Sequence, residues 1–448
     1  MTKDLTTGRI TPLLVNFTVP LVLGNIFQLT YNAVDSIIVG RYVGPGALAA
    51  VGICNPLMTL LILFLNGLCM GAGILIGTQY GAKDYDTMKR QISTTMLAGV
   101  IFSAALTLVC IVFAVPILRL LHVDPSIMEL TTGYMRIVFT GLVFTYLYNF
   151  FSSTLRALGD AKSPLYFLII SAVINVLGDL FFVVVLHMGS TGCAIATVIS
   201  EALSALFCVL YIQKKIPMLR LGRAWFTFDR GLLKQTVAYG WTSAMQQGTV
   251  QLGKIVVSAI VNSMGVSVAA AFTAVNRIDD FAYIPQQNIG HAMTALMAQN
   301  RGAGKKDRMW KGFKSGMMLE AIYGLAICLV CFLLAEPLMR LFVEDAEVIG
   351  HGVRYLHLIA LMYLMPAVTN GVQGFFRGIG DLKITLLSSM VNMGVRVLFA
   401  FPMVIWLGFG IEALPYSYMA GWIGMLVVEL PLLMRQCRSY IGKPSQEA

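Results

Sequence analysis

Long apolar segments, each followed by a short polar stretch, run along almost the whole chain. A helix needs about 20 predominantly apolar residues to cross the hydrocarbon core of a bilayer. The pattern predicts twelve spanning helices, at 12–42, 47–80, 90–121, 129–157, 163–187, 191–213, 231–262, 267–299, 309–342, 350–378, 383–408 and 412–436. We therefore expect an all-α polytopic membrane protein with six helices on each side of a polar linker.

The two sets of six helices are similar to each other in sequence. At a shift of 221 residues, Ala114–Leu121 aligns with Ala335–Phe342, and Arg156–Leu165 aligns with Arg377–Leu386. Gln79–Lys83 aligns with Gln299–Lys305 when the second copy is given two additional residues. One constant shift over such distances indicates an internal repeat. We predict an N-terminal lobe at 1–213, a cytoplasmic linker at 214–230 and a C-terminal lobe at 231–448.

Composition and charge agree with a membrane protein. Hydrophobic residues make up 57% of the chain and charged residues 12%, whereas soluble domains carry about 25% charged residues. If both termini are cytoplasmic, the inner segments hold 24 Lys and Arg and the outer segments hold 5, the bias that orients membrane proteins. The net charge of +10 is thus spread over short loops, and no long basic patch points to nucleic acid.

The orientation has consequences for the two halves. Each half has an even number of spans, so both start on the cytoplasmic side and form parallel repeats, with the substrate path expected between them. The matching Gly-Asp-x-Lys stretches at 159–162 and 380–383 are predicted to be turns. The first helix lacks a cleavage site and is expected to remain as a membrane span.

Acidic residues inside predicted spans need an explanation, because a charge at the centre of a bilayer costs roughly 2.5 to 3.5 kcal/mol on insertion scales. These acids are Asp35, Asp179, Glu201, Asp279, Asp280, Glu320 and Glu429. Helical spacing places Gln28 and Asn32 on the same face as Asp35, Asn175 on that of Asp179, and Thr197 on that of Glu201. Such oxygens suit a hard cation such as Na⁺ or a carboxyl that takes up a proton. The alternative is a static network that holds helices together.

Other polar positions are candidates for a substrate cavity. Arg277 could neutralise one of the neighbouring aspartates, leaving the other to attract cationic substrates, or could form an internal ion pair with it. The candidates for the cavity are Gln28, Asn32, Gln246, Gln247, Asp279, Asp280 and Gln286. The partners of Lys254 and Arg396, and the role of Glu201, stay open.

The cysteines and the absent motifs narrow the function. The eight cysteines lie mostly inside apolar segments, where a free Cys packs as a small hydrophobic residue. The sequence contains no Walker A motif, H-E-x-x-H or G-x-S-x-G, so neither an ATP-driven pump nor an enzyme is expected. A secondary transporter without a cofactor fits best.

With Pro20, Tyr31–Gly40, Gln79–Lys83 and Arg156–Lys162 in two six-span halves, the chain resembles the multidrug and toxic compound extrusion (MATE) family over its whole length. The resemblance is to the prokaryotic branch whose cation site lies in the N-terminal lobe, and it implies a V-shaped pair of lobes. It further implies that Pro20 is a hinge, and that a cation site is formed by Asp35, Asn175, Asp179 and Thr197, with Tyr134 beside them. These four residues would be the ligands if the ion is Na⁺.

A second branch of the family carries acids in spans 7 and 10, where this chain has Gln246, Gln247, Asn370 and Gln373. This difference argues against a cation site in the C-terminal lobe.

The resemblance implies a multidrug efflux antiporter that exchanges amphipathic, mainly cationic compounds for Na⁺ or H⁺. We expect a monomer in the bacterial cytoplasmic (inner) membrane, with a link to antibiotic resistance. The alternative is a flippase of the same superfamily for lipid-linked oligosaccharides or peptidoglycan precursors, which Lys254, Arg277 and Arg396 keep open.

Overall fold

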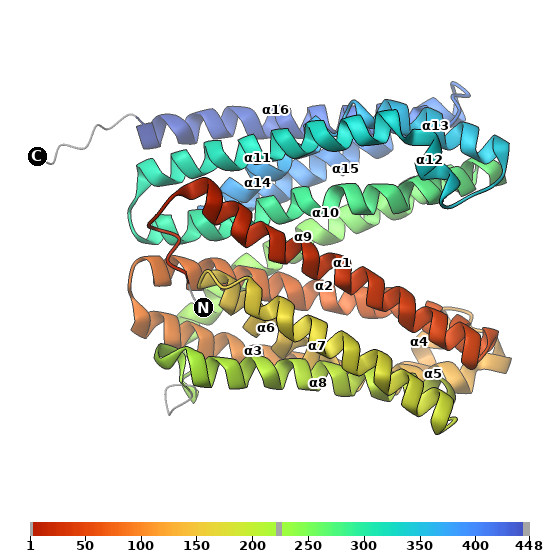
Figure 1. Ribbon diagram of the computed structural model, residues 1–448, viewed down its shortest axis with the longest axis horizontal. Coiled ribbons are helices and arrows are strands. Elements are labelled where there is room, and N and C mark those ends of the chain that lie inside the picture. The colour runs from red at the N-terminus through yellow and green to blue at the C-terminus, as the bar shows by residue number, and fades with distance from the viewer. Residues whose placement is uncertain (1–2, 221–225, 442–448) are drawn as a thin grey trace, which may run out of the picture. The chain divides into compact units, whose positions relative to one another are not determined.

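The computed structural model describes residues 3–220 and 226–441, which form helices and no strand (Figure 1). The α-helices of the first half are α1 (Ile10–Tyr42), α2 (Pro45–Gly81), α3 (Tyr85–Val112), α4 (Ala114–Leu120), α5 (Pro125–Thr140), α6 (Leu142–Ala157), α7 (Lys162–Asp179) and α8 (Gly189–Lys215). Two short elements interrupt the α-helical pattern, the π-helix η1 (Leu180–Val185) and the 3₁₀-helix η2 (Pro217–Leu219). The second half contains α9 (Arg230–Asn262), α10 (Val266–Gly302), α11 (Lys306–Leu333), α12 (Ala335–Arg340), α13 (Ala346–Ala360), α14 (Leu364–Gly378), α15 (Leu382–Ile405) and α16 (Ala413–Ile441).

The twelve expected spans all coincide with helical segments, and several of the spans are broken. Span 4, for example, consists of α5 and α6, which meet at Gly141. Among the described residues, nine segments are long and apolar enough to cross a membrane, and the pair α13 and α14, bent by 51°, makes a tenth. The remaining two, α9 and α10, are long enough but carry more polar residues. The all-α, polytopic fold class is confirmed.

The internal repeat is visible in the backbone. At the shift of 221 residues, α2 and α10 have the same first and last positions, and so do α3 and α11. Three pairs of turn residues at this shift have similar positive φ angles: Gly44 (111°) and Gly265 (105°), Lys83 (59°) and Gly304 (69°), and Gly159 and Gly380 (both 82°). Lys83 therefore corresponds to Gly304. The two additional residues placed in the second copy were wrong, because the helices on both sides keep one constant shift.

The chain divides into two compact units whose bounds differ from the predicted lobes. Unit 1 comprises Met1–Asp4 and Val19–Ala244, and unit 2 comprises Leu5–Thr18 and Met245–Ala448. The first part of α1 thus belongs to unit 2, and the first part of α9 belongs to unit 1. The predicted linker at 214–230 lies partly outside the described residues, since these resume at 226.

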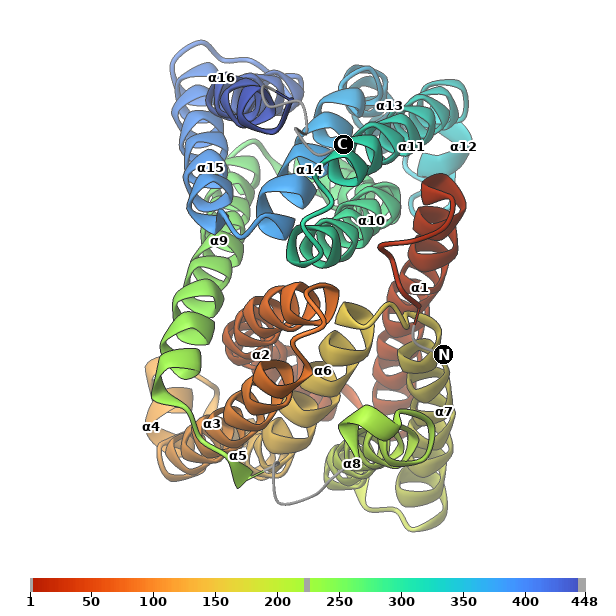
Figure 2. The same ribbon diagram turned by 90° about the vertical axis from the view of Figure 1, so that its left-hand side faces the viewer.

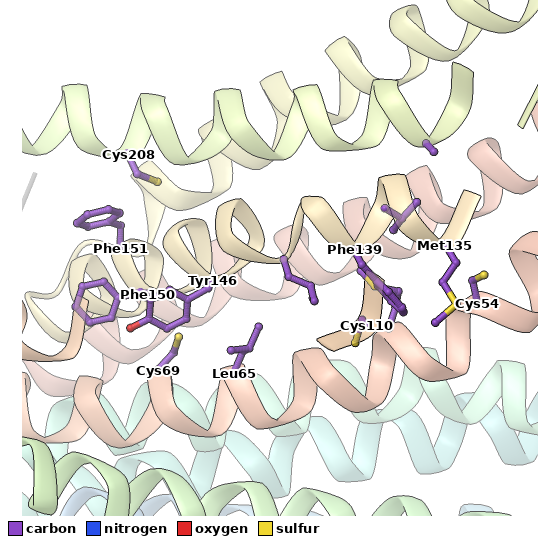
Figure 3. Packing of buried hydrophobic residues seen from close by; sticks show 14 of the residues in the cluster. Cys54, Leu65, Cys69, Cys110, Met135, Phe139, Tyr146, Phe150, Phe151 and Cys208 are labelled. Carbon is purple, nitrogen blue, oxygen red and sulfur yellow. The ribbon is translucent and has the colours of Figure 1, made fainter. Parts of the chain in front are cut away.

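The core of unit 1 lies between α2, α3, α5, α6 and α8 (Figure 3). Tyr146 is fully buried there, its hydroxyl donates to the carbonyl of Thr95 at 2.7 Å, and its ring stacks on Phe150 with centroids 5.8 Å apart. Helices α7 and α8 pack side by side at the edge of the unit (Figure 2).

Unit 2 has a separate core, built mainly from the end of α9, α10, α12, α13 and the start of α16. Tyr355 and Tyr363 are fully buried in it, and Tyr283 contacts the rings of Tyr363 and Trp422. Helices α15 and α16 pack side by side, as α7 and α8 do in unit 1 (Figure 2). Each unit therefore buries its own apolar residues.

Candidate cation site in unit 1

Four helices of unit 1 bring the predicted cation ligands together. Asp35 comes from α1, Asn175 and Asp179 from α7, Thr197 from α8 and Tyr134 from α5. Asp179 is fully buried, Asn175 and Tyr134 are nearly so, and Asp35 is half-buried. Asp179 is the last residue of α7, where the backbone continues as the π-helix η1. Single π-helical turns occur frequently at functional sites.

The polar atoms of these residues form a compact group. One ligand atom each from Asp35, Asp179 and Cys193 lies within 4.8 Å of the other two. The Cys193 thiol donates to Oδ1 of Asp35 at 2.8 Å. The amide of Asn175 donates to the Thr197 hydroxyl at 3.4 Å, and that hydroxyl donates to the Cys193 carbonyl at 3.1 Å. Sequence positions 158 residues apart thus share one site.

The site has an excess of negative charge that the described residues do not neutralise. No Lys, Arg or His among them forms an ion pair with Asp35 or Asp179. Both carboxylate oxygens of Asp179 and the side-chain oxygen of Asn175 are buried and have no hydrogen-bond partner within the described structure. Two close carboxylates in a medium of low dielectric constant cannot both stay ionised without a compensating positive charge. A proton or a cation bound here would supply that positive charge.

The donor set fits both kinds of positive charge. Carboxylate, amide and hydroxyl oxygens are the ligands that hard cations prefer. The Cys193 sulfur is soft and a poor ligand for Na⁺, so its place is that of a weak hydrogen-bond donor to Asp35.

Cys193 is the residue of the site that sequence reasoning missed. We assigned the cysteines to apolar packing, and Cys193 is fully buried in the core of unit 1, but its thiol also donates to a carboxylate. The signal in the sequence was its position four residues before Thr197, on the same face of α8. Glu201 lies one further turn along α8, beside Gly141, where an added Cβ would come within 2.7 Å of its Oε2.

Of the residues predicted to line a substrate cavity, some are exposed and the others are buried. Gln28 and Asn32 of unit 1, and Gln247 and Asp280 of unit 2, are exposed. The buried group consists of Gln246, Asp279 and Gln286.

The buried group forms hydrogen bonds within unit 2. Gln246 donates to Gln373 and to Ser389, both at 3.1 Å. Asp279 accepts from the Tyr363 hydroxyl, and Gln286 donates to the Tyr363 carbonyl at 3.1 Å. In this structure the three side chains therefore connect helices of unit 2, and their role in lining a substrate cavity stays a prediction.

The basic residues inside the predicted spans of unit 2 also differ in placement. The guanidinium of Arg396 lies 4.0 Å from the centroid of the Tyr418 ring and 5.0 Å from that of Trp422. Lys254 and Arg277 are exposed. Among the ion pairs of the described residues, none joins Arg277 to Asp279 or Asp280. The expected neutralisation of an aspartate by Arg277 is not found.

The two repeated halves of long apolar helices define a polytopic membrane protein. A family model described as MatE matches residues 20–181 and 243–401. The chain belongs to this MATE family, which is a family of transporters and not of enzymes. The resemblance found in the sequence is confirmed, and a membrane location follows from it.

Curated relatives and solved structures agree with this assignment. The chain is 31% identical over 395 residues to "Probable multidrug resistance protein YoeA" of Bacillus subtilis, covering 86% of this chain and 85% of that protein. It is 28% identical to "Probable multidrug resistance protein YpnP" of the same organism, over 90% and 91% of the two chains. The fold matches an outward-facing multidrug resistance MATE family transporter with a TM-score of 0.91 and 21% identity, covering 99% and 100% of the chains.

Proposed function

We propose that this protein is a multidrug efflux antiporter that exports amphipathic, mainly cationic compounds in exchange for Na⁺ or H⁺. The observation that carries the proposal is the pair of half-buried Asp35 and fully buried Asp179, which has no cationic partner among the described residues. The names of the relatives, multidrug resistance and multidrug export proteins, support the substrate class. No cofactor is needed, since the ion gradient supplies the driving force.

The coupling ion acts through its different affinities for two states of the transporter. A ligand shifts an equilibrium between two states only when it binds one of them more tightly. In the proposed cycle, Na⁺ or H⁺ enters from outside and binds Asp35 and Asp179, with the oxygens of Asn175 and Thr197 as further ligands for Na⁺. Binding favours the state that releases the drug, and loss of the ion to the cytoplasm restores the drug-binding state.

Three further groups of residues have assigned roles in the proposal. Tyr134 limits access of water to the carboxylates from its buried position in α5. Pro20 is the hinge of α1, inside which it lies. The exposed polar residues are the candidates for contact with substrate, and they are Gln28, Asn32, Gln247 and Asp280.

The proposed setting is the cytoplasmic membrane of a bacterium, with the protein as a monomer and both termini in the cytoplasm. The ratio of 24 to 5 Lys and Arg between inner and outer segments supports this orientation. The bacterial relatives support the cellular setting.

The test is ethidium efflux from proteoliposomes that contain the purified full-length protein, with Na⁺ and pH gradients imposed separately. We expect one gradient to drive efflux in the wild type and Asp35→Asn to abolish this dependence, because an amide cannot supply the negative charge that binds the ion. Glu129→Gln is the matched control, since Glu129 is an exposed acid of α5 in the same unit. Gradient-driven efflux that survives in Asp35→Asn would contradict the proposal.

The flippase alternative rests on Lys254, Arg277 and Arg396. A cavity for a pyrophosphate group needs accessible basic side chains, and of these three Arg396 is buried against two aromatic rings whereas Lys254 and Arg277 are exposed. Absence of ethidium efflux under both gradients, together with movement of a labelled lipid-linked substrate, would favour the flippase.

A further inference from the structure

A basic cavity lies in unit 2, away from the carboxylates of unit 1. Its volume is about 700 Å³, and it is lined by the beginning of α1 and by one face of α11. Figures 1 and 2 show the start of α1 beside α11. The polar side chains that line it are Arg9, Thr11, Arg308, Lys311, Lys314 and Ser315. Four of the six carry a positive charge, and no acidic residue is among the lining residues that the structure describes.

Arg308 fixes the shape of this cavity. Its guanidinium donates to the carbonyl oxygens of Leu5, at 3.1 and 3.2 Å, and of Gly8, at 2.7 Å. These bonds hold the chain that enters α1 against α11, as does the contact of 3.3 Å between the hydroxyls of Thr11 and Ser315. These hydrogen bonds therefore fix this wall of the cavity before any ligand binds.

The remaining positive charges are available to a ligand. Arg9, Lys311 and Lys314 are exposed, and none of them forms an ion pair among the residues that the structure describes. Lys314 lies over the Trp310 ring, 5.4 Å from its centroid. Helix α1 begins at Ile10, so the partial positive charge of its N-terminal end adds to the field. The chemistry is that of a phosphate-binding site.

Among possible sources of a phosphate group, the surroundings favour a lipid. From Lys311, the same face of α11 continues through Met318 and Ile322, both exposed and apolar, at helical spacing. Helix α11 is one of the segments long and apolar enough to span the membrane. A ligand whose phosphate lies among the lysines can therefore extend its acyl chains along α11.

We propose that this cavity binds the phosphate-bearing headgroup of an anionic phospholipid. The Lys and Arg bias assigns this end of the helices to the cytoplasmic leaflet, where anionic lipids attract basic segments. The site ties the start of α1 to the membrane surface independently of ion coupling.

The test measures lipid binding to the full-length protein in detergent by native mass spectrometry. The probes are short-chain phosphatidylglycerol, short-chain phosphatidylcholine and inorganic phosphate. We expect saturable binding of phosphatidylglycerol that is weakened about tenfold in the double variant Lys311→Gln/Lys314→Gln. The matched control is Lys214→Gln/Lys215→Gln, which removes the same charge from two exposed lysines at the end of α8.

Three outcomes would overturn the proposal. Equal weakening in both double variants would show non-specific attraction to surface charge. Equal binding of phosphatidylcholine would show that the negative charge is not recognised, and equally tight binding of inorganic phosphate would show a site for a soluble anion.

A second measurement locates the lipid. Brominated phosphatidylglycerol is expected to quench the fluorescence of Trp310, which contacts Lys314, and this component should vanish in Trp310→Phe. Quenching that is unchanged in Trp310→Phe would place the lipid elsewhere and overturn the proposal.

Discussion

At the scale of single residues, the packing of unit 1 depends on the space that Gly99 leaves for the ring of Tyr146 because it has no side chain. A Cβ added at Gly99 of α3 would come within 1.8 Å of Cζ of Tyr146 and 2.0 Å of its hydroxyl oxygen. Tyr146 cannot withdraw easily, because it is fully buried and its hydroxyl is bonded to the Thr95 carbonyl. The close approach of α3 and α6 therefore requires glycine at this position.

Gly99→Ala is expected to destabilise the protein by about 1 to 3 kcal/mol, the usual cost of overpacking a core. The matched control is Gly133→Ala, because Gly133 is also helical and a Cβ there meets nothing within 4 Å. That control should be neutral or stabilising, since alanine favours a helix over glycine by about 1 kcal/mol. The measurement is the thermal midpoint of the purified protein in detergent, and equal midpoints for both variants would contradict the packing argument.

The residues of the cation site differ in how far the sequence could predict them. Helical spacing pairs Asn175 with Asp179 on one face of α7, and the resemblance to the MATE family supplies their partners Asp35 and Thr197. Cys193 could not be assigned in this way, because its role depends on the approach of α8 to α1. Periodicity within one helix contains no information about which other helix it meets.

At the scale of elements, α1 is one of the two helices that pass from one unit to the other, and α9 is the second. The residues of α1 up to Thr18 belong to unit 2 and those from Val19 onward to unit 1, so Pro20 lies directly after the change. Proline removes one backbone hydrogen bond from the helix interior and clashes with the preceding turn. Bending at this point is consequently cheaper than elsewhere along α1, which supports the hinge proposed for Pro20.

Pro20→Ala is expected to raise the thermal midpoint, because a helix-interior proline costs about 3 kcal/mol relative to alanine, and to slow gradient-driven efflux. Pro56→Ala is the control, since Pro56 lies inside α2 within one unit. It should raise the midpoint similarly and leave the efflux rate unchanged. The same efflux rate in Pro20→Ala as in the wild type would argue against a hinge.

The sequence predicted which segments are helical better than it predicted where those helices are broken. Spans 3 (90–121) and 9 (309–342) are each interrupted by one residue, Phe113 in the first and Leu334 in the second, directly before a short helix. The two interruptions are equivalent in the repeat. An average over about 20 residues detects an apolar span, but it does not resolve one residue with non-helical geometry. Burial of polar residues such as Gln286 was likewise invisible, because a glutamine that contacts a neighbouring helix has the same sequence signature as one that faces a cavity.

At the scale of the whole molecule, the number of membrane crossings depends on α9 and α10, the two segments that were not apolar enough to qualify on hydropathy. Their lengths of 33 and 37 residues exceed what a bilayer requires. Three buried polar side chains of α10 have partners inside the protein: Asp279 and Gln286 contact Tyr363, and Asn288 donates to the Ile284 carbonyl. Polar groups satisfied in this way do not prevent a helix from spanning.

A twelve-span topology is distinguished from a ten-span one by the turn between α9 and α10. Loss of this pair of crossings would leave both termini where they are but would move the turn from the outside to the cytoplasm.

We therefore expect Asn262→Cys, an exposed position at the end of α9, to react with a membrane-impermeant maleimide in intact cells. Asp86→Cys, exposed in the first turn of α3, should react only after the cells are permeabilised, and the wild type gives the background from the native cysteines. Labelling of Asn262→Cys only after permeabilisation would exclude twelve crossings. Labelling from outside would show that α9 and α10 both cross the membrane although neither qualifies on hydropathy.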